Sequence, residues 1–133
     1  MNTGGDEVQE ALQRDRTIDM ITTGAKSGLP RRTEIWFTNV GGRIIICGTP
    51  GAAGDRGPYT PRDWMANLRA HQEFTFCLKE SLHEELPARA VPVTDPEDRR
   101  ALMSAPETQW YRDQTGSVEA LVKSSPIVEV FFE

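Results

Sequence analysis

The feature that most constrains this chain is a short segment rich in glycine and positive charge, placed between two stretches that predict β-strands. The segment, residues 22–32, reads TTGAKSGLPRR. Apolar and polar residues alternate before it, at residues 18–20, and residues 33–38 after it also predict a strand. The sequence therefore predicts a β-hairpin with a positively charged loop. The cations of this loop are Lys26, Arg31 and Arg32.

The chemistry of this loop suits an anionic ligand. Gly24 and Gly28 can adopt positive φ and bring backbone N–H groups close to a ligand. Lys26, Arg31 and the Ser27 hydroxyl can reach anionic oxygens. A solvated hairpin turn explains the same composition, because Gly, Ser and Pro are common in turns. The segment does not match a Walker phosphate loop, since it joins two strands and no glycine directly precedes the lysine.

Length and charge limit the classes of protein that this chain can represent. Its 133 residues predict one domain, residues 1–133, in which residues 1–16 form a polar arm or short helix. A net charge of -5 argues against a general nucleic-acid binder, so the basic loop suits a small phosphorylated ligand. Residues 1–16 lack the apolar run of a signal peptide, and no apolar run reaches membrane-spanning length. These features, with two isolated cysteines, predict a cytoplasmic protein without disulfides.

The pattern along the chain predicts a mainly β (α+β) fold. Six segments read as strands, and their alternation favours an antiparallel sheet in a barrel or sandwich. Pro87 and Pro92 predict that the fifth of these strands is an edge or bulged strand. Two or three short helices are expected, one beginning at residues 94–97. Residues 49–61 lack any period and predict a long loop of the kind that often binds ligands.

Several motifs in this order resemble the deazaflavin-dependent nitroreductase family, within the flavin-binding split β-barrel superfamily. Residues 22–31 are similar to its T-T-G-R-K-S-G-x-P-R signature, and residues 64–68, WMANL, are similar to its W-x-x-N-L helix. The resemblance spans roughly residues 18–130 and includes the strand beginning at Pro126. It implies a six-stranded antiparallel split β-barrel that binds coenzyme F420, a deazaflavin, and passes hydride to a small organic acceptor such as a quinone, nitro compound or activated alkene.

The resemblance also implies which residues hold the coenzyme. The implied cofactor-binding residues are Gly24, Lys26, Ser27, Gly28, Arg31, Arg32, Thr49, Trp64 and Asn67. Two positions depart from the family pattern, because Ala25 replaces an arginine and Pro50 stands where a second coenzyme-binding lysine is common. These departures leave two alternatives open, an oxidoreductase dependent on FMN and a non-enzymatic protein that binds a flavin or tetrapyrrole.

For several other residues, the sequence allows both a functional role and a role in packing. Tyr59 and Tyr111 are candidate proton donors for the reduced acceptor, although either can serve in packing. Trp64 suits core packing more often than ring stacking. His71 and His83 stand far apart without other ligands nearby, so no metal site is predicted.

Split barrels usually pair, and the aromatic strands here predict a homodimer. The aromatic residues on which this expectation depends are Trp36, Phe37, Phe131 and Phe132.

Overall fold

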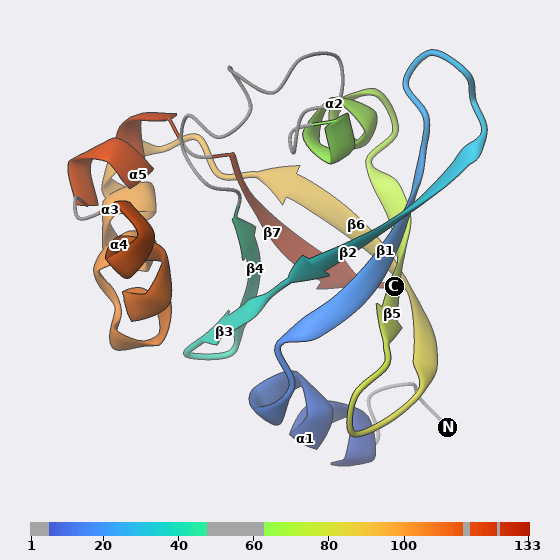
Figure 1. Ribbon diagram of the computed structural model, residues 1–133, viewed down its shortest axis with the longest axis horizontal. Helices are drawn as coiled ribbons and strands as arrows, with labels where there is room; N and C mark the ends of the chain where they lie inside the picture. Colours follow the sequence, from blue (N-terminus) through green and yellow to red (C-terminus); the bar gives the residue numbers. More distant parts are fainter. Residues whose placement is uncertain (1–5, 48–62, 116–117, 125) are drawn as a thin grey trace.

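A seven-stranded antiparallel sheet, curled into a half-barrel, forms the centre of the structure (Figure 1). The computed structural model describes residues 6–47, 63–115, 118–124 and 126–133. The strands are β1 (Thr17–Thr23), β2 (Pro30–Trp36), β3 (Thr38–Val40), β4 (Arg43–Cys47), β5 (Glu73–Leu78), β6 (Glu84–Pro92) and β7 (Ile127–Phe132). The helices are α1 (Asp6–Arg14), α2 (Asp63–Ala70), α3 (Pro96–Ser104), α4 (Gln109–Thr115) and α5 (Val118–Ser124), with a 3-10 turn at Pro106–Thr108.

The sheet curls because one continuous chain segment forms both of its edges. The strand order is β2-β1-β5-β6-β7-β4-β3, so the edge strands β2 and β3 are consecutive in the sequence. Between them, the Phe37 amide donates to the Arg16 carbonyl at 2.8 Å, and the Phe37 side chain is buried. The chain bends there and changes partner from β1 to β4. One predicted strand thus becomes two, which gives seven strands rather than the six expected.

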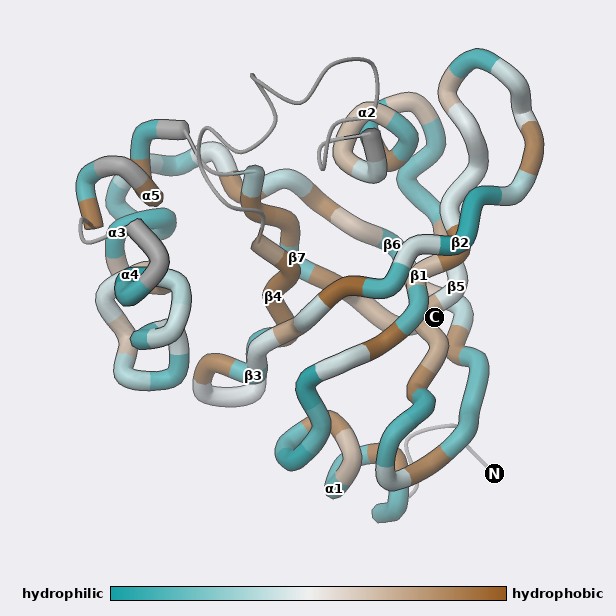
Figure 2. The backbone as a smooth tube through the Cα atoms, viewed as in Figure 1, coloured by the Kyte–Doolittle hydropathy of each residue, from teal (hydrophilic) through white to brown (hydrophobic). Residues whose placement is uncertain are grey.

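Two hydrophobic clusters stabilise this arrangement. The main core fills the curl of the sheet, with α1 and α2 packed against it. The second lies where α3, α4 and α5 pack beside β4 and β7, both strongly hydrophobic in Figure 2. Because β4 contributes Ile44 and Ile46 to the first cluster and Ile45 and Cys47 to the second, it is apolar along nearly its whole length.

Side chains from the helical layer cap backbone groups and tie the helices together. α3 begins as predicted, since the Asp95 carboxylate accepts from the Asp98 amide at 2.9 Å and proline occupies the first turn. Arg99 donates to the Val93 and Val122 carbonyls, at 2.7 and 2.8 Å, and so connects α3 with α5. None of the described helices is long and apolar enough to cross a membrane.

The expectation that the two prolines mark an edge or bulged strand is wrong, because β6 is not an edge and its registers with β5 and β7 are unbroken. β6 is a central strand that pairs with β5 on one side and β7 on the other. Its ladder with β7 runs from Ala88 to Pro92, so Pro87 lies just before that ladder and Pro92 is its last residue. The prolines therefore stand at the ends of the β6–β7 ladder, where a missing N–H group costs least, although Pro87 lies opposite Thr75 within the β5–β6 ladder.

Candidate functional site

The loop between β1 and β2 is shaped by its own hydrogen bonds. The Gly24 amide donates to the Leu29 carbonyl at 2.8 Å, and the Gly28 amide donates to the Gly24 carbonyl at 2.9 Å. Gly28 has a φ of +72°, and a Cβ atom at Gly24 would lie 2.5 Å from the Ser27 hydroxyl oxygen. Gly28 therefore has the positive φ that was expected, whereas Gly24 does not, and a side chain at Gly24 would have to displace the Ser27 hydroxyl.

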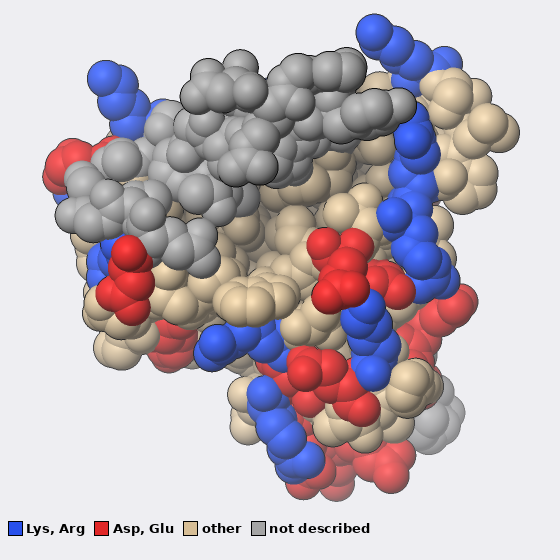
Figure 3. Space-filling model, viewed as in Figure 1, with Lys and Arg blue, Asp and Glu red and all other residues tan. Residues whose placement is uncertain are grey.

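Several donors of this loop remain available to a ligand. The backbone amides of Lys26 and Ser27 have no acceptor among the described residues, and both residues are exposed. The side chains of Lys26 and Arg31 form no hydrogen bond or ion pair within the described part of the chain. Figure 3 shows Lys and Arg atoms gathered over the β1–β2 hairpin, at the upper right of the molecule. Free amides beside two cations form a donor set that fits a phosphate or carboxylate.

Helix α2 connects this loop to the core through Asn67. The Asn67 side-chain oxygen accepts from the Ala25 amide at 2.9 Å, and its amide nitrogen donates to the Thr22 hydroxyl at 3.2 Å. Trp64 and Leu68, one turn apart on α2, are buried in the main core and hold the helix in place. The two sequence motifs therefore meet in the structure, through residues that are 42 positions apart.

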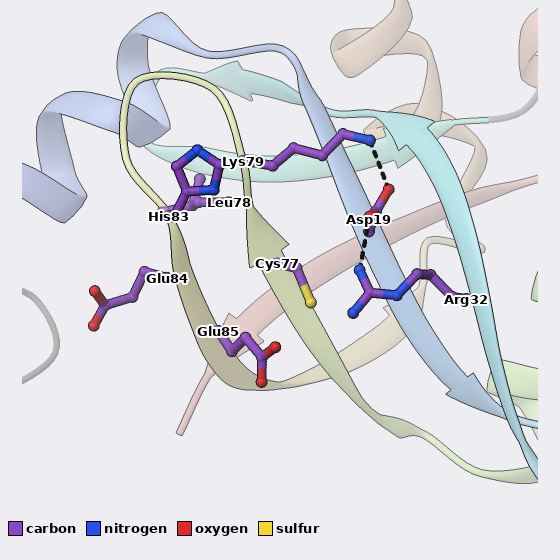
Figure 4. A pocket seen from close by; sticks show the side chains of 8 residues that line it. All are labelled: Asp19, Arg32, Cys77, Leu78, Lys79, His83, Glu84 and Glu85. Atoms are coloured by element: carbon purple, nitrogen blue, oxygen red, sulfur yellow. Dashed lines mark hydrogen bonds and ion pairs between the residues drawn. The ribbon is translucent and has the colours of Figure 1, made fainter.

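Arg31 and Arg32 do not converge on the same site. In the β1–β2 ladder Arg31 lies opposite Thr22, whose side chain is buried on the inner face of the sheet. Arg32 points to the outer face, where its guanidinium donates to the Asp19 carboxylate at 2.7 Å (Figure 4). Lys79 donates to the other oxygen of the same carboxylate at 2.8 Å. The charge of Arg32 is thus partly neutralised on the face opposite to Arg31.

A cavity of about 350 Å³ lies beside this ion pair on the outer face, over β1, β5 and the start of β6 (Figure 4). The hydrogen bond from Lys79, and then that from Arg32, keeps the pKa of Asp19 below its ordinary value. Burial raises the pKa of the Cys77 thiol, which lies opposite Asp19 in the β1–β5 ladder. Asp19 is therefore a paired carboxylate and Cys77 a protonated thiol, and neither has the character of a nucleophile.

The remaining predicted site residues do not lie together at the β1–β2 loop. Trp64 is buried in the main core, with 4% of its surface exposed. Thr49 and Tyr59 lie outside the described residues. Figure 1 shows that α4, which carries Tyr111, is on the other side of the molecule from the β1–β2 loop. The structure thus brings Gly24, Lys26, Ser27, Gly28, Arg31 and Asn67 together and places Tyr111 elsewhere.

Tyr111 is a buried residue of the second hydrophobic cluster. Its ring contacts that of Trp110, with centroids 3.6 Å apart, and only 3% of its surface is exposed. Its hydroxyl faces Thr38 and the Cys47 backbone without a hydrogen bond of acceptable geometry to any described residue. Burial raises the pKa of Tyr111 far above its usual range. A phenol in this position is poorly suited to exchange protons with a bound ligand.

Two residues that shape the site were missed by the sequence reasoning. Thr22 is 1% exposed and connects Asn67 with the hairpin. Its signal was present, because it continues the inward-facing positions of Ile18 and Met20 with a polar side chain. Asp19, which pairs with Arg32, stands on the outward-facing positions of the same strand and gave no comparable signal.

Comparisons with known proteins agree with this geometry. The family model described as F420H(2)-dependent quinone reductase matches residues 1–123. Among solved structures, a FAD-binding protein from Mesorhizobium loti aligns with a TM-score of 0.66 and 13% identity, over 100% of this chain and 91% of that one. A protein described as an F420-H2 dependent reductase aligns with a TM-score of 0.54 and 20% identity, over 88% and 95% of the two chains. A chain described as a domain-swapped dimer aligns with a TM-score of 0.55 and 21% identity, over 98% and 87%.

These structural similarities establish the fold, and the family match establishes the class of protein. The resemblance read from the T-T-G-x-K-S-G and W-x-x-N-L motifs is therefore confirmed, together with its half-barrel architecture and its dependence on F420. The match spans the basic loop, helix α2 and the helical layer up to α5. The chain belongs to the F420H(2)-dependent quinone reductase family, and it is an oxidoreductase.

Proposed function

We propose that this protein binds reduced F420 through its β1–β2 loop and reduces a quinone-type acceptor. The observation that carries the proposal is the loop itself, in which two backbone amides and the side chains of Lys26 and Arg31 have no partner among the described residues. F420 carries a phosphodiester and an acidic tail, and both are ligands that such donors favour. The family match supports the same coenzyme.

The chemistry of the proposed reaction divides between coenzyme and protein. The coenzyme supplies a hydride, and this hydride with one proton converts a quinone to a hydroquinone. The protein binds the anionic part of the coenzyme and orients it. Because Tyr111 is buried away from the loop, we propose that the proton comes from solvent or from a residue outside the described part of the chain.

A double substitution of the loop cations tests this proposal. Replacing Lys26 and Arg31 together by alanine should weaken F420 binding by about 2–5 kcal/mol, if both make charge-assisted contacts partly shielded from water. The matched control replaces Arg14 and Lys123, two exposed cations on α1 and α5, and changes the net charge equally. Isothermal titration measures both variants. Equal affinities for the two would remove the loop from the coenzyme site.

We also propose a homodimer, although only two of the four aromatic residues on which the sequence prediction depended are exposed. Phe37 is buried, and Phe132 packs edge-on against Phe76 with centroids 5.1 Å apart. Trp36 and Phe131 remain exposed, at 42% and 41%, and support an intersubunit contact. Light scattering at micromolar concentration should give twice the chain mass of 14.9 kDa. A monomer that still binds F420 would contradict the dimer without affecting the coenzyme proposal.

A further inference from the structure

We infer that Asn67 is a positioning residue that holds the basic loop in its anion-binding shape, and is not itself a ligand of the coenzyme. This inference rests on the proposed function of the loop. Asn67 uses both ends of its side-chain amide within the protein, at 2.9 Å to the Ala25 amide and 3.2 Å to the Thr22 hydroxyl. The groups proposed to face the ligand belong to Lys26, Ser27 and Arg31, which Asn67 does not contact directly.

The direction of each hydrogen bond follows from the donors present. A backbone amide can only donate, so the group that faces Ala25 must be the Asn67 carbonyl oxygen. The Asn67 amino group then faces Thr22, whose own hydroxyl donates to the Arg31 carbonyl at 3.5 Å. This chain of hydrogen bonds joins the loop tip, β1 and β2 to one side chain of α2. Thr22 is 1% exposed, so these partners take the place of water.

The positions of both candidate ligand cations depend on this connection. Lys26 directly follows the amide that Asn67 holds, and Arg31 supplies the carbonyl at the other end of the hydrogen-bond chain. Asn67 is itself fixed, because α2 is anchored in the main core by Trp64 and Leu68. Without Asn67 the loop tip would lose its hydrogen bond to α2, and binding an anion would require more ordering of the loop.

The chain contains a matched control for this role. Asn39 accepts from the Gly42 amide at 2.7 Å and donates to the Leu12 carbonyl at 3.2 Å, so it also ties a turn to a helix. Its turn joins β3 to β4 and lies near the opposite end of the molecule from the β1–β2 loop (Figure 1). Replacing Asn39 by alanine likewise removes one hydrogen bond from a backbone amide and one from the side-chain amide, the latter to a carbonyl instead of a hydroxyl, without touching the basic loop.

The experiment compares Asn67→Ala with Asn39→Ala in two measurements. Hydrogen exchange of the Ala25 amide, followed by NMR without coenzyme, should accelerate by about tenfold or more in Asn67→Ala and stay unchanged in Asn39→Ala. The dissociation constant for F420 should rise by about tenfold in Asn67→Ala and remain at the wild-type value in Asn39→Ala. Unchanged exchange at Ala25 would overturn the inference.

A double-mutant cycle separates positioning from direct contact. If Asn67 acts through the loop cations, Asn67→Ala should cost little further affinity when Lys26 and Arg31 are already alanine. Fully additive losses would show that Asn67 does not act through the loop cations and would overturn the inference.

Thr22→Val provides a second test, because valine has nearly the same size and shape as threonine. The substitution removes the hydroxyl that Asn67 binds, and Thr22 is too buried to touch a ligand. We expect it to weaken F420 binding by about threefold or more. Unchanged affinity in this variant would contradict positioning through Thr22.

If the wild-type protein bound no F420, the proposed function would fail, while the exchange rate of Ala25 would still report whether Asn67 holds the loop.

Discussion

Arg31 and Arg32 are adjacent in the sequence but lie on opposite faces of β2. Arg31 shares the inner face with Thr22, beside the loop that α2 supports, and forms no ion pair within the described residues. Arg32 lies on the outer face and pairs with Asp19, which Lys79 also contacts. Only Arg31 of these two cations therefore lies on the face that we propose to hold the ligand of Lys26.

This relationship predicts unequal effects of two otherwise equivalent substitutions. Arg31→Ala should weaken F420 binding by about tenfold or more, because it removes a charge on the ligand-facing side. Arg32→Ala removes the same charge from the far side and should leave the affinity nearly unchanged. Titration of F420 fluorescence at fixed ionic strength measures both. Similar losses in the two variants would indicate that net charge, and not the geometry of the hairpin, attracts the coenzyme.

Arg43 should be a stabilising residue, because it joins β4 to both β7 and α3. Its guanidinium donates to the Asp98 carboxylate at 2.9 and 3.0 Å and to the Glu129 carboxylate at 2.7 and 3.2 Å. Since 38% of the Arg43 side chain is exposed, we expect Arg43→Ala to lower the free energy of unfolding by about 1–2 kcal/mol. Urea denaturation measures the loss. Arg100→Ala, which breaks a more exposed pair with Glu119, should cost less, and an equal cost would contradict this account.

The same cluster predicts how stability responds to acid. Arg43 holds the pKa of Asp98 below its ordinary value of 3.8. A carboxyl whose pKa is lower in the folded than in the unfolded chain stabilises the fold above its ordinary pKa, and this contribution is lost as the pH falls through the folded value. The difference in unfolding free energy between wild type and Asp98→Asn should therefore be constant above about pH 5 and shrink as the pH falls further, through 3.8 and towards the lower folded pKa. A difference that is constant with pH would show that Asp98 is not paired in solution.

Tyr111 should act as a packing residue. Its buried hydroxyl lacks a hydrogen-bond partner among the described residues, so Tyr111→Phe should leave the unfolding free energy unchanged or raise it by up to about 1 kcal/mol. Tyr111→Ala should instead lose about 3–5 kcal/mol, because it leaves a cavity in the second hydrophobic cluster. Thermal unfolding measures stability, and quinone reduction by the Phe variant tests catalysis. A large loss of turnover in the folded Phe variant would support Tyr111 as the proton donor and contradict this prediction.

Local chemistry made much of the fold predictable. The alternation of apolar and polar residues predicted most of the strands, and the Asp95-Pro96 pair predicted the start of α3. The bend at Phe37 was not predictable, because it depends on a hydrogen bond to Arg16 and on the change of partner from β1 to β4. Helix α5 left a signal that was overlooked, since Val118, Leu121 and Val122 follow helical spacing.

The site was predictable in composition and less so in geometry. Glycine spacing identified the loop, and the positive φ of Gly28 explains why glycine stands at that position. Arg31 and Arg32 lie on opposite faces because of the strand register, and Arg32 pairs with Asp19. No local sequence pattern predicted the pairing with Asp19. The contact between Asn67 and Ala25 joins residues 42 positions apart, so it required the fold.

Competitive binding of the two coenzymes tests the central claim most directly. Oxidised F420 is titrated into the protein while quenching of its fluorescence is followed, and FMN is then added as competitor. The account predicts that F420 binds at least tenfold more tightly, about 1.4 kcal/mol, because its acidic tail adds contacts with Lys26 and Arg31. It also predicts that this preference disappears in the Lys26→Ala, Arg31→Ala double variant. Tighter binding of FMN by the wild-type protein would contradict the account.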